Sequence, residues 1–451
     1  MDNQVSIESK SSIGWFRWTI CGFLFLATAL NYMDRAVIGI LKPDLAKQLN
    51  WSEQDYANIV IAFSIAYAIG YSWAGWFIDR VGVKLGYTLA VFFWSLAEIA
   101  HAFIWFIPIE AKIQIWLMAM PATVLGFCAA RFALGLAEGG NFPAAGKTVS
   151  EWFPKKERAL AVGIFNSGSN IGALVAPILI PLVAVGLSWP IAFLITPTVA
   201  FIWIVLWLLF YQSPEKHKWV TPTELAHIRS DPPDPPGLKI PWLTLFRYRQ
   251  TWMFVIGTGI SGTIWWFWLY WVPDFLSKQY NLNMKQFGPP IAIIYLMTGV
   301  GSIGGGWLSG YFLKRGWSLN AARKTAMLIC ALCVVPVFTA CSVSNIWVAA
   351  LLIGLAAASH QGFAANLITT VSDTAPRQVV ASIMGLGGTA ACVGVMFFAK
   401  LVAYVLEKTG EYRILFIIAS CSYLITLLII HLINPRLESM KFDVSQIQQK
   451  T

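Results

Sequence analysis

The chain has 451 residues, of which 57% are hydrophobic and 12% are charged, and its formal net charge is +10. The hydrophobic residues fall in runs of about twenty or more, which at 1.5 Å per residue match the roughly 30 Å hydrocarbon core of a bilayer. This composition excludes an ordinary soluble domain. It predicts an integral membrane protein.

Breaks at charged and Pro/Gly clusters divide the chain into twelve candidate spans. Helices are expected because lipid cannot hydrogen-bond exposed backbone groups, and because the alternating pattern of a membrane barrel is missing. The first span is too long and too charged internally for a signal peptide, so we expect it to be retained. The expected spans are 15–41, 54–78, 85–107, 115–140, 158–183, 188–212, 251–276, 286–313, 323–342, 345–370, 379–405 and 412–434.

The distribution of Lys and Arg predicts the orientation of the spans. Most of the 32 basic residues lie on one side if the N-terminus is cytoplasmic, so both termini are expected in the cytoplasm. The net charge then follows from topology and from contact with membrane lipid headgroups, and no nucleic-acid partner is expected. We expect a monomer without a cofactor or metal; the Cys330 and Cys333 pair is interpreted as helix packing rather than a zinc site.

One long polar segment, which contains "SDPPDPPGLKIP", predicts a cytoplasmic linker between two halves. The two halves share a sequence spacing. A Pro and a Gly follow Glu138 in the first half at the same intervals at which a Pro and a Gly follow His360 in the second. The prediction is an all-α protein of two pseudo-symmetric six-helix bundles with a site near the midplane between them. The expected parts are an N-terminal bundle at 1–212, the linker at 213–250, a C-terminal bundle at 251–435 and a cytoplasmic tail at 436–451.

Four charged residues lie inside spans of the first half: Asp34, Arg35, Arg131 and Glu138. Each costs roughly 2.5–3.5 kcal/mol at the centre of a membrane helix, so these side chains should face a cavity or one another. Arg131 and Glu138 are one heptad apart and share a helix face, whereas Asp34 and Arg35 must point at different neighbours.

The chemistry of these groups suggests different roles. A guanidinium is always charged and grips a carboxylate through two hydrogen bonds, so Arg35 is interpreted as an anion clamp. A partly desolvated carboxylate can take up a proton near physiological pH, so Asp34 and Glu138 are interpreted as proton carriers. The alternative is a neutral buried network that only fixes helix packing.

The second half offers neutral polar and aromatic side chains within its spans. Amide and hydroxyl groups suit a polyhydroxylated ligand, and an aromatic face suits the C–H side of a sugar ring. For His360 a helix-to-helix hydrogen bond is the alternative, and most of the tryptophans in "TIWWFWLYW" are expected at the interface or in lipid. Glu98 and His101 are also interpreted as interfacial. The candidate ligand contacts are Tyr67, Asn166, Asn170, Trp266, Tyr270, His360, Gln361 and Asn366.

The stretch "GWFIDRVGVKLG" resembles the G-x-x-x-D-R-x-G-x-K loop motif of the major facilitator superfamily. The resemblance implies that this loop latches one conformation. The residues that match the motif are Gly75, Asp79, Arg80, Gly82 and Lys84.

Nearly the whole chain further resembles the anion:cation symporter family within that superfamily. The matching stretches are "YMDRA", "RFALGLAEGGNFPA", "EWFPKKERALAVG" and "AARKTAM", and "SHQGFAANLITTVSD" is most similar to bacterial hexuronate transporters. The resemblance implies a bacterial inner-membrane protein with Arg35 as the carboxylate binder, Asp34 and Glu138 as protonation sites, and Arg131 as their charge partner. It also implies Tyr32, Tyr67 and Tyr270 as cavity residues.

Two departures bear on the substrate. Ser261 stands where vesicular glutamate carriers of this family have a second arginine, so a dicarboxylate is less favoured. Gly388 stands where aldonate relatives have an Asn, which counts against an open-chain aldonate.

The sequence thus predicts a symporter that imports a sugar-acid monoanion with protons, most similar to hexuronate carriers, by alternating access of two bundles. The alternatives within the transporter class are an aldonate (galactonate-type) symporter and an organic-anion exchanger. A membrane sensor or channel is the alternative from another class. An enzyme is not expected, because no metal cluster, nucleophile elbow or nucleotide loop is present in the sequence.

Overall fold

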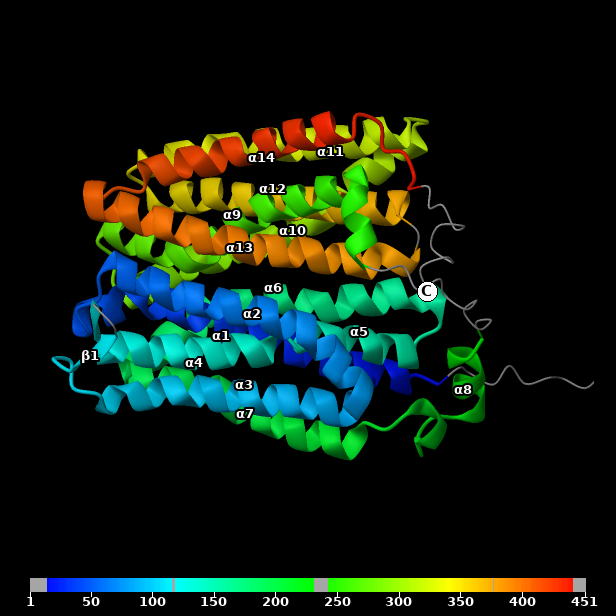
Figure 1. Cartoon of the computed structure of the whole chain (residues 1–451), viewed down its shortest axis with the longest axis horizontal. Helices are drawn as coiled ribbons and strands as arrows, with labels where there is room; N and C mark the ends of the chain where they lie inside the picture. Colours follow the sequence, from blue (N-terminus) through cyan, green and yellow to red (C-terminus); the bar gives the residue numbers. More distant parts are fainter. Residues whose placement is uncertain (1–13, 116–117, 231–241, 376, 441–451) are drawn as a thin grey trace, which may run out of the picture.

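In a computed structural model of the chain, the structure describes residues 14–115, 118–230, 242–375 and 377–440. Twelve helices among these residues are long and apolar enough to cross a membrane, one for each expected span. The prediction of an all-α membrane protein is therefore confirmed. The helices run nearly parallel and form two groups, which lie one above the other in Figure 1.

The helix bounds define the two bundles. The first bundle consists of α1 (Phe16–Gln48), α2 (Glu53–Val81), α3 (Val83–Phe103), α4 (Ala122–Glu138), α5 (Asn141–Trp152), α6 (Lys155–Gly186) and α7 (Trp189–Phe210). The second consists of α9 (Arg249–Tyr280), α10 (Met284–Lys314), α11 (Leu319–Val334), α12 (Ile346–Thr374), α13 (Arg377–Thr409) and α14 (Arg413–Ile433). The short helix α8 (Pro222–Ile228) lies between them in sequence. Short 3₁₀ turns follow α3 and α11 at Ile104–Phe106 and Val335–Cys341, and others occur at Pro214–Lys216 and Trp242–Arg247.

The fourth span differs from its predicted bounds. Its expected start at residue 115 falls in an antiparallel hairpin of β1 (Lys112–Ile115) and β2 (Met118–Pro121), in which Lys112 pairs with Pro121. The span instead runs from Ala122 to Trp152, through α4, a break at Gly139 and Gly140, and α5. The apolar residues before Pro121 have the composition of a membrane helix, but their backbone hydrogen bonds are made across the hairpin.

Arg17, near the start of α1, binds the segment after the first bundle. Arg17 Nε donates to Glu157 Oε2 at 2.8 Å, and its Nη1 donates to Glu224 Oε1 of α8 at 3.2 Å. His227 of α8 also contacts Glu157, at 2.9 Å. Burial raises the pKa of Glu157 less than the hydrogen bonds from Arg17 and His227 lower it, so its pKa lies below the ordinary value. Part of the expected linker is therefore packed against α1, while "DPPDPPGLKIP" lies outside the described residues.

The superfamily loop motif forms the α2–α3 corner. Asp79 accepts a hydrogen bond from Lys147 of α5 at 2.6 Å, and the Arg80 guanidinium lies 4.6 Å from the Trp76 ring centroid. Gly82 joins the two helices with a φ of 82°, a left-handed conformation that a side chain would strain. The Lys84 carbonyl accepts from Trp207 Nε1 at 3.3 Å, so the corner is tied to α7 as well.

Helix α1 continues beyond its expected end at residue 41 and buries Lys42, which is 1% exposed. Lys42 Nζ lies 2.6 Å from Asp274 of α9 and 2.8 Å from Glu53 of α2. Lys278 of α9 lies 2.5 Å from Glu53 and 3.1 Å from Asp274. We call these four residues the gate cluster, because they join the two bundles at the end opposite α8, where the β hairpin lies (Figure 1).

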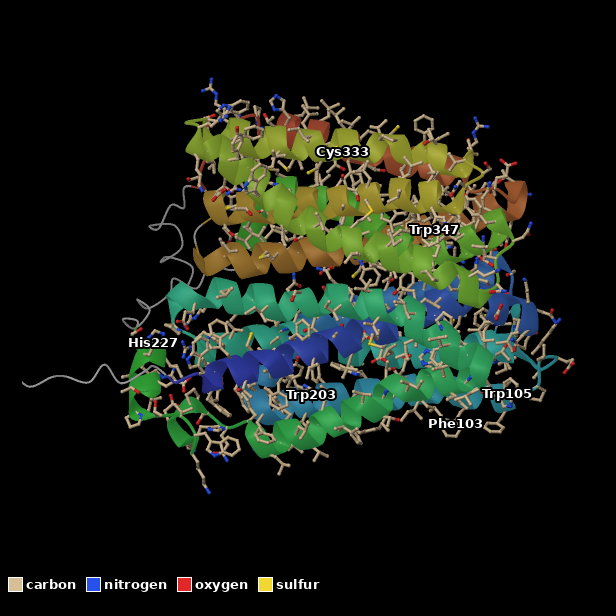
Figure 2. All side chains as sticks on the ribbon, turned by 180° about the vertical axis from the view of Figure 1, so that it is seen from behind. Phe103, Trp105, Trp203, His227, Cys333 and Trp347 are labelled. Atoms are coloured by element: carbon tan, nitrogen blue, oxygen red, sulfur yellow. The ribbon has the colours of Figure 1, made fainter. Side chains whose placement is uncertain are left out.

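Further contacts hold the same ends of the bundles together. Lys400 of α13 donates to Asn58 of α2 at 2.6 Å, and the backbone N–H of Gln54 donates to Glu407 Oε1 at 3.2 Å. The Tyr56 hydroxyl donates to the Tyr270 carbonyl at 2.9 Å. In Figure 2, Phe103 and Trp105 project from this hairpin end and His227 lies at the other. The structure is therefore closed at the hairpin end.

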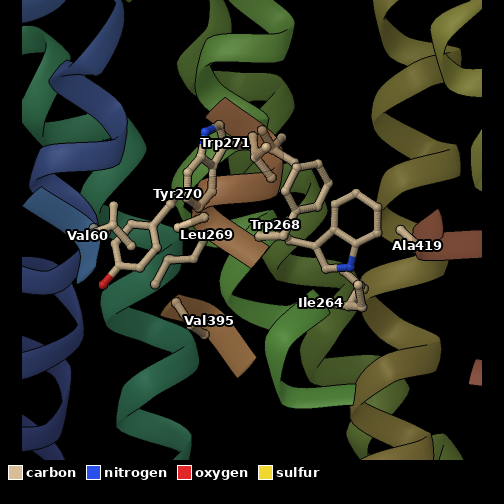
Figure 3. Close-up of a cluster of buried hydrophobic side chains, with 14 of the residues drawn as sticks. Val60, Ile264, Trp268, Leu269, Tyr270, Trp271, Val395 and Ala419 are labelled. Carbon is tan, nitrogen blue, oxygen red and sulfur yellow. The ribbon is translucent and has the colours of Figure 1, made fainter. Parts of the chain in front are cut away.

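Aromatic side chains of α9 lie next to the gate cluster. Trp268 and Trp271 are each 2% exposed, so the expectation that most tryptophans of this stretch face lipid or the interface is wrong for them. Trp268 packs edge-on against Phe416, and Trp271 packs edge-on against Tyr56 of the first bundle. Figure 3 shows Tyr270 pointing away from this cluster toward Val60 of α2. Packing within the second bundle accounts for the burial of Trp268, and packing between the bundles accounts for that of Trp271.

We expect Asp274→Asn to weaken the closed hairpin end. The substitution leaves buried Lys42 with one anionic partner where it had two, and breaking a buried ion pair costs about 3–5 kcal/mol when nothing replaces it. A Val60→Cys reporter, in a background without the native cysteines, should react at least about tenfold faster with a polar maleimide.

Glu407→Gln is the matched control, because Glu407 also bridges the bundles but is exposed. Its labelling rate should stay close to that of the parent. Equal rates for Asp274→Asn and the parent would show that the gate cluster does not hold this end closed.

Candidate functional site

The site is centred on an ion pair between α1 and α4. Arg35 Nη2 donates to Glu138 Oε2 at 2.8 Å, and Arg35 Nε donates to the same oxygen at 3.1 Å. Arg35 Nη2 also donates to Asn31 Oδ1 at 3.2 Å. Both charged side chains are buried, with exposures of 1% and 0%. Because neither charge has bulk water to stabilise it, each depends on the other in this conformation.

Aromatic rings surround the Arg35 guanidinium. Its central carbon lies 4.5 Å from the Tyr67 ring centroid, 4.8 Å from Tyr32 and 5.3 Å from Phe63. The Trp266 ring of α9 lies at 4.9 Å, so the second bundle contributes directly to this cage. Cation–π attraction of this kind strengthens as water is excluded. The predicted residues Tyr32, Tyr67 and Trp266 are thus brought together around Arg35.

Glycines place Glu138 against its neighbours. A Cβ at Gly135 would lie 2.5 Å from the Phe63 carbonyl oxygen, and one at Gly139 would lie 2.4 Å from the Tyr71 amide nitrogen. Only glycine lets the backbones of α2 and α4 approach this closely. Glu138 is the last residue of α4, directly before the break at Gly139 and Gly140. The close packing therefore fixes the height and direction of its carboxylate.

Arg131 and Asp34 lie behind the ion pair, inside the first bundle. Arg131 Nη2 donates to the Arg35 carbonyl at 3.1 Å, whereas its Nε and Nη1 have no hydrogen-bond partner among the described residues. Both Asp34 carboxylate oxygens are likewise buried without one, although the Thr196 side chain of α7 faces them. Asp34 and Glu138 lie within electrostatic range of Arg131, but neither forms an ion pair with it within the described ranges.

Glu98 and His101 belong to the interior of the first bundle and not to its interface with water. Each side chain is 0% exposed, so the interfacial interpretation is wrong. Their position near the end of an apolar helix suggested contact with headgroups. In the structure α4 and α7 cover this face of α3, and the His101 ring stacks on Phe193 at 4.9 Å.

The neutral polar candidates occupy different surroundings. His360 is hydrogen-bonded to the Tyr423 hydroxyl at 2.8 Å and stacks on Trp265. Asn366 Nδ2 donates to the Gly305 carbonyl at 2.8 Å and to that of Gly362 at 2.9 Å. Both side chains therefore link helices within the second bundle. Asn166 is exposed, and Asn170 and Gln361 are partly buried.

Tyr270 presents an unused hydroxyl to the first bundle. Its side chain is 1% exposed, its ring lies 5.5 Å from Trp266, and its hydroxyl has no hydrogen-bond partner within the described ranges. It lies within electrostatic range of Arg35 and Arg131. A carboxylate that reached Arg35 would find a hydroxyl donor on the opposite bundle.

The sequence analysis did not single out three residues that the structure places at the site or in the gate cluster. Lys42 lies directly after the expected end of the first span, Asp274 lies two residues before the expected end of the seventh, and Phe63 is an ordinary apolar residue by pattern. A signal was available for the first two, because each is a charged residue within one helical turn of an apolar run. Phe63 gave no such signal, because only the tertiary arrangement of the helices brings its ring to Arg35.

The arrangement can exchange one anion for another. Arg35 is held by a carboxylate that becomes neutral when protonated, and the freed guanidinium then requires a new anionic partner. The aromatic rings around the Arg35 guanidinium offer flat apolar faces, and the Tyr270 hydroxyl and the side-chain amides of the candidate residues offer hydrogen bonds. Such a site suits a small carboxylate ligand with a polar ring.

Comparisons with known proteins show the family to which the chain belongs. Residues 24–399 match the sequence profile described as Major Facilitator Superfamily. The chain is 32% identical to the hexuronate transporter of Escherichia coli strain K12 over 399 residues, which cover 87% of this chain and 88% of that protein. It is 33% identical to the galacturonate transporter of Dickeya chrysanthemi over 302 residues, covering 66% and 83%. The similarity to hexuronate transporters predicted from the sequence is confirmed.

Solved structures share the fold. A crystal structure of a D-xylose–proton symporter aligns with a TM-score of 0.70 at 14% identity, over 95% of this chain and 100% of that one. A bacterial homologue of the human lysosomal transporter Spinster, in an inward-facing conformation, aligns with a TM-score of 0.66 at 18% identity, covering 95% and 96%. These alignments confirm the two-bundle architecture.

We expect Gly135→Ala to destabilise the protein because its methyl group would press on the α2 backbone. Overpacking of this kind costs about 1–3 kcal/mol. The thermal midpoint of unfolding in detergent should fall, and Gly146→Ala is the matched control, since a Cβ there meets no atom within 4 Å. Helix propensity should leave that control unchanged or more stable by up to about 1 kcal/mol. Equal midpoints for the two variants would contradict the close α2–α4 packing.

Proposed function

Because the chain belongs to the Major Facilitator Superfamily and is a multi-pass membrane transporter, we propose that it imports a hexuronate monoanion together with protons. The observation that carries this proposal is the buried Arg35–Glu138 pair inside an aromatic cage shared by both bundles. The proposed location is the bacterial inner membrane, with both termini in the cytoplasm and the protein acting as a monomer.

The names of the relatives support a sugar acid as the substrate. They include hexuronate and galacturonate transporters, and also a D-galactonate transporter of Escherichia coli O6:H1 at 26% identity. Ser261, in place of a second arginine, is buried and donates to the Gly257 carbonyl, so it supplies no second cation for a dicarboxylate. A Cβ at Gly388 would meet no heavy atom within 4 Å, so packing alone does not explain why this chain has no Asn there.

Protonation of Glu138 is the proposed coupling step. A neutral Glu138 no longer neutralises Arg35, and an unpaired buried guanidinium is unfavourable by several kcal/mol. The substrate carboxylate takes over the role of Glu138 and accepts both guanidinium hydrogen bonds. When the proton leaves toward the cytoplasm, Glu138 competes for Arg35 again and the substrate is released. Asp34, with Arg131 as its charge partner, is the second proposed proton carrier.

The remaining candidates are proposed to bind the sugar ring. Trp266, Tyr67 and Tyr32 offer ring faces to its C–H side, while Tyr270 and Gln361 offer hydrogen bonds. Asn166 and Asn170 of α6 are proposed for the hydroxyls. His360 and Asn366 are already hydrogen-bonded within the second bundle, so we propose that both shape the site. We further propose that Asn366 contacts the substrate through its Oδ1 atom, which has no partner among the described residues.

The transport cycle is proposed to be alternating access. The gate cluster closes the hairpin end, and opening there requires its ion pairs to separate. The loop residues Gly75, Asp79, Arg80, Gly82 and Lys84 are proposed to latch the opposite state. Import of one monoanion with more than one proton carries net positive charge inward. An organic-anion exchanger would use the same site, but it would not respond to a pH gradient alone.

The direct test is uptake of labelled galacturonate or glucuronate into proteoliposomes with an imposed acidic exterior. We expect concentrative uptake by the parent protein, and galactonate should compete less well than either hexuronate. Glu138→Gln should abolish concentrative uptake but retain counterflow, because a permanently neutral residue 138 still frees Arg35. Glu110→Gln, on an exposed loop, is the matched control.

Two results would overturn this proposal. The parent protein would fail to respond to the pH gradient if it is an exchanger, and a channel would show no counterflow. Equal loss of counterflow and concentrative uptake in Glu138→Gln would remove Glu138 from the coupling step.

Arg35→Lys should weaken substrate binding even though it keeps the charge. An ammonium cannot donate two parallel hydrogen bonds or stack flat on several rings. We expect the KM for uptake to rise by at least about tenfold, which corresponds to roughly 1.4 kcal/mol. Arg315→Lys is the control, since Arg315 also lies over a ring, Tyr311, but is exposed. An unchanged KM in Arg35→Lys would show that the carboxylate binds elsewhere.

A further inference from the structure

We propose that Glu98 and His101 of α3 form a further proton-binding site, which shares a proton with Asp34 inside the first bundle. The inference rests on the proposed function for its physiological meaning, because a buried proton store matters to a proton-coupled carrier. The structural basis is independent of the substrate. It consists of the burial of these side chains, their missing partners and the balance of charge around them.

The Glu98 carboxylate is completely buried, and neither of its oxygens has a hydrogen-bond partner among the described residues. An ionised carboxylate in such a place is strongly unfavourable, whereas a protonated one loses much less. Glu98 therefore differs from surface carboxylates such as Glu215, which is paired with Arg229 and remains half exposed.

His101 supplies a second base beside Glu98. Its Nδ1 lies 2.9 Å from the Ala97 carbonyl oxygen, 3.2 Å from the Glu98 carbonyl oxygen and 3.7 Å from the Glu98 carboxylate. Carbonyl oxygens only accept hydrogen bonds, so Nδ1 carries the hydrogen. The lone pair of the neutral ring is then on Nε2, which has no partner within the described ranges. The pair thus presents two unoccupied proton acceptors one helical turn apart.

The charges around Glu98 are balanced when the buried group holds one proton. The charged groups within electrostatic range of Glu98 are Asp34 of α1 and, on α4, which packs against this face of α3, Arg131 and Glu138. Glu138 is neutralised by Arg35, so Arg131 alone faces both Asp34 and Glu98. If both carboxylates were ionised, the buried group would carry one uncompensated negative charge. A single proton held by Asp34 or Glu98 makes it neutral.

The free hydrogen-bonding atoms complement this arrangement. Arg131 Nε and Nη1, both Asp34 oxygens and both Glu98 oxygens are all without partners among the described residues. The side chains of Phe127 and Phe193 close the layer around His101. A proton placed there can move between Asp34 and Glu98 as Arg131 shifts between them, and phenyl rings shield it from exchange with bulk water.

Infrared spectroscopy of the purified full-length protein tests this site without any substrate. Absorption from protonated carboxyl groups should be present at neutral pH, and Glu98→Gln should remove one component of it. The pH at which the remaining buried carboxyls titrate should also shift, because Asp34 then holds Arg131 alone. Glu110→Gln, on an exposed loop, should leave the spectrum unchanged.

Transport measurements connect the site with function. In proteoliposomes we expect Glu98→Gln to shift the pH profile of hexuronate uptake by about one unit or more, and His101→Gln to shift it in part. Glu98→Asp should restore the parent profile because it restores a titrating carboxyl. A purely structural role for Glu98 would lower the amount of folded protein without moving the profile.

The outcomes separate this inference from the proposed function. If the parent protein shows no protonated carboxyl at neutral pH, or if Glu98→Gln leaves both the infrared spectrum and the pH profile unchanged, the Glu98 site is refuted while coupled uptake stands. If the parent shows no pH-driven uptake but Glu98→Gln removes a protonated carboxyl, the proton site stands and the proposed function falls. If Glu98→Gln does not fold, the infrared spectra of the parent and of His101→Gln decide the matter.

Discussion

The structure depends on one buried ion pair, between Arg35 and Glu138. Removing a guanidinium and a carboxylate from water is costly for each, and in this pair each offsets the cost of the other, so the state of one determines what the other can do. The neighbouring features follow from this constraint. Close packing of α2 and α4 at Gly135 and Gly139 sets the position of Glu138. The rings around Arg35 hold the guanidinium in place and exclude water from it.

The same constraint organises the rest of the first bundle. Asp34 and Arg131 are buried near the pair but are not fully hydrogen-bonded within the described ranges, which is unusual for a protein interior. A bundle built only for stability would not retain so many charged groups. Their incomplete pairing is what a site needs if protons and an anionic ligand are to enter and leave it. In the second bundle, by contrast, the His360 ring and the Asn366 amide nitrogen are hydrogen-bonded to groups of that same bundle.

Much of this fold could be predicted from the sequence, because the length and apolarity of the spans determine membrane helices almost independently of tertiary structure. The charges at Asp34, Arg35, Arg131 and Glu138 likewise had to be buried together. Partner choice was less predictable. Which carboxylate lies against Arg35 depends on how α4 is rotated toward α1, and the burial of Lys42 depends on how far α1 extends. The predictions for the hairpin at 112–121 and for the position of Glu98 were wrong for the same reason. Composition does not reveal which neighbouring segment covers a given face of a helix or strand.

The gate cluster and the Arg35 site share two helices, and this has a mechanical consequence. Lys42 follows Arg35 by two turns on one face of α1, and Asp274 follows Tyr270 by one turn on α9. Each helix therefore carries a residue of the Arg35 site near its middle and a residue of the gate cluster nearer its end, next to Pro43 in α1 and Pro273 in α9. A change in the tilt of either helix at the Arg35 site would therefore also move a residue of the gate cluster, so the two places are coupled through the covalent chain itself.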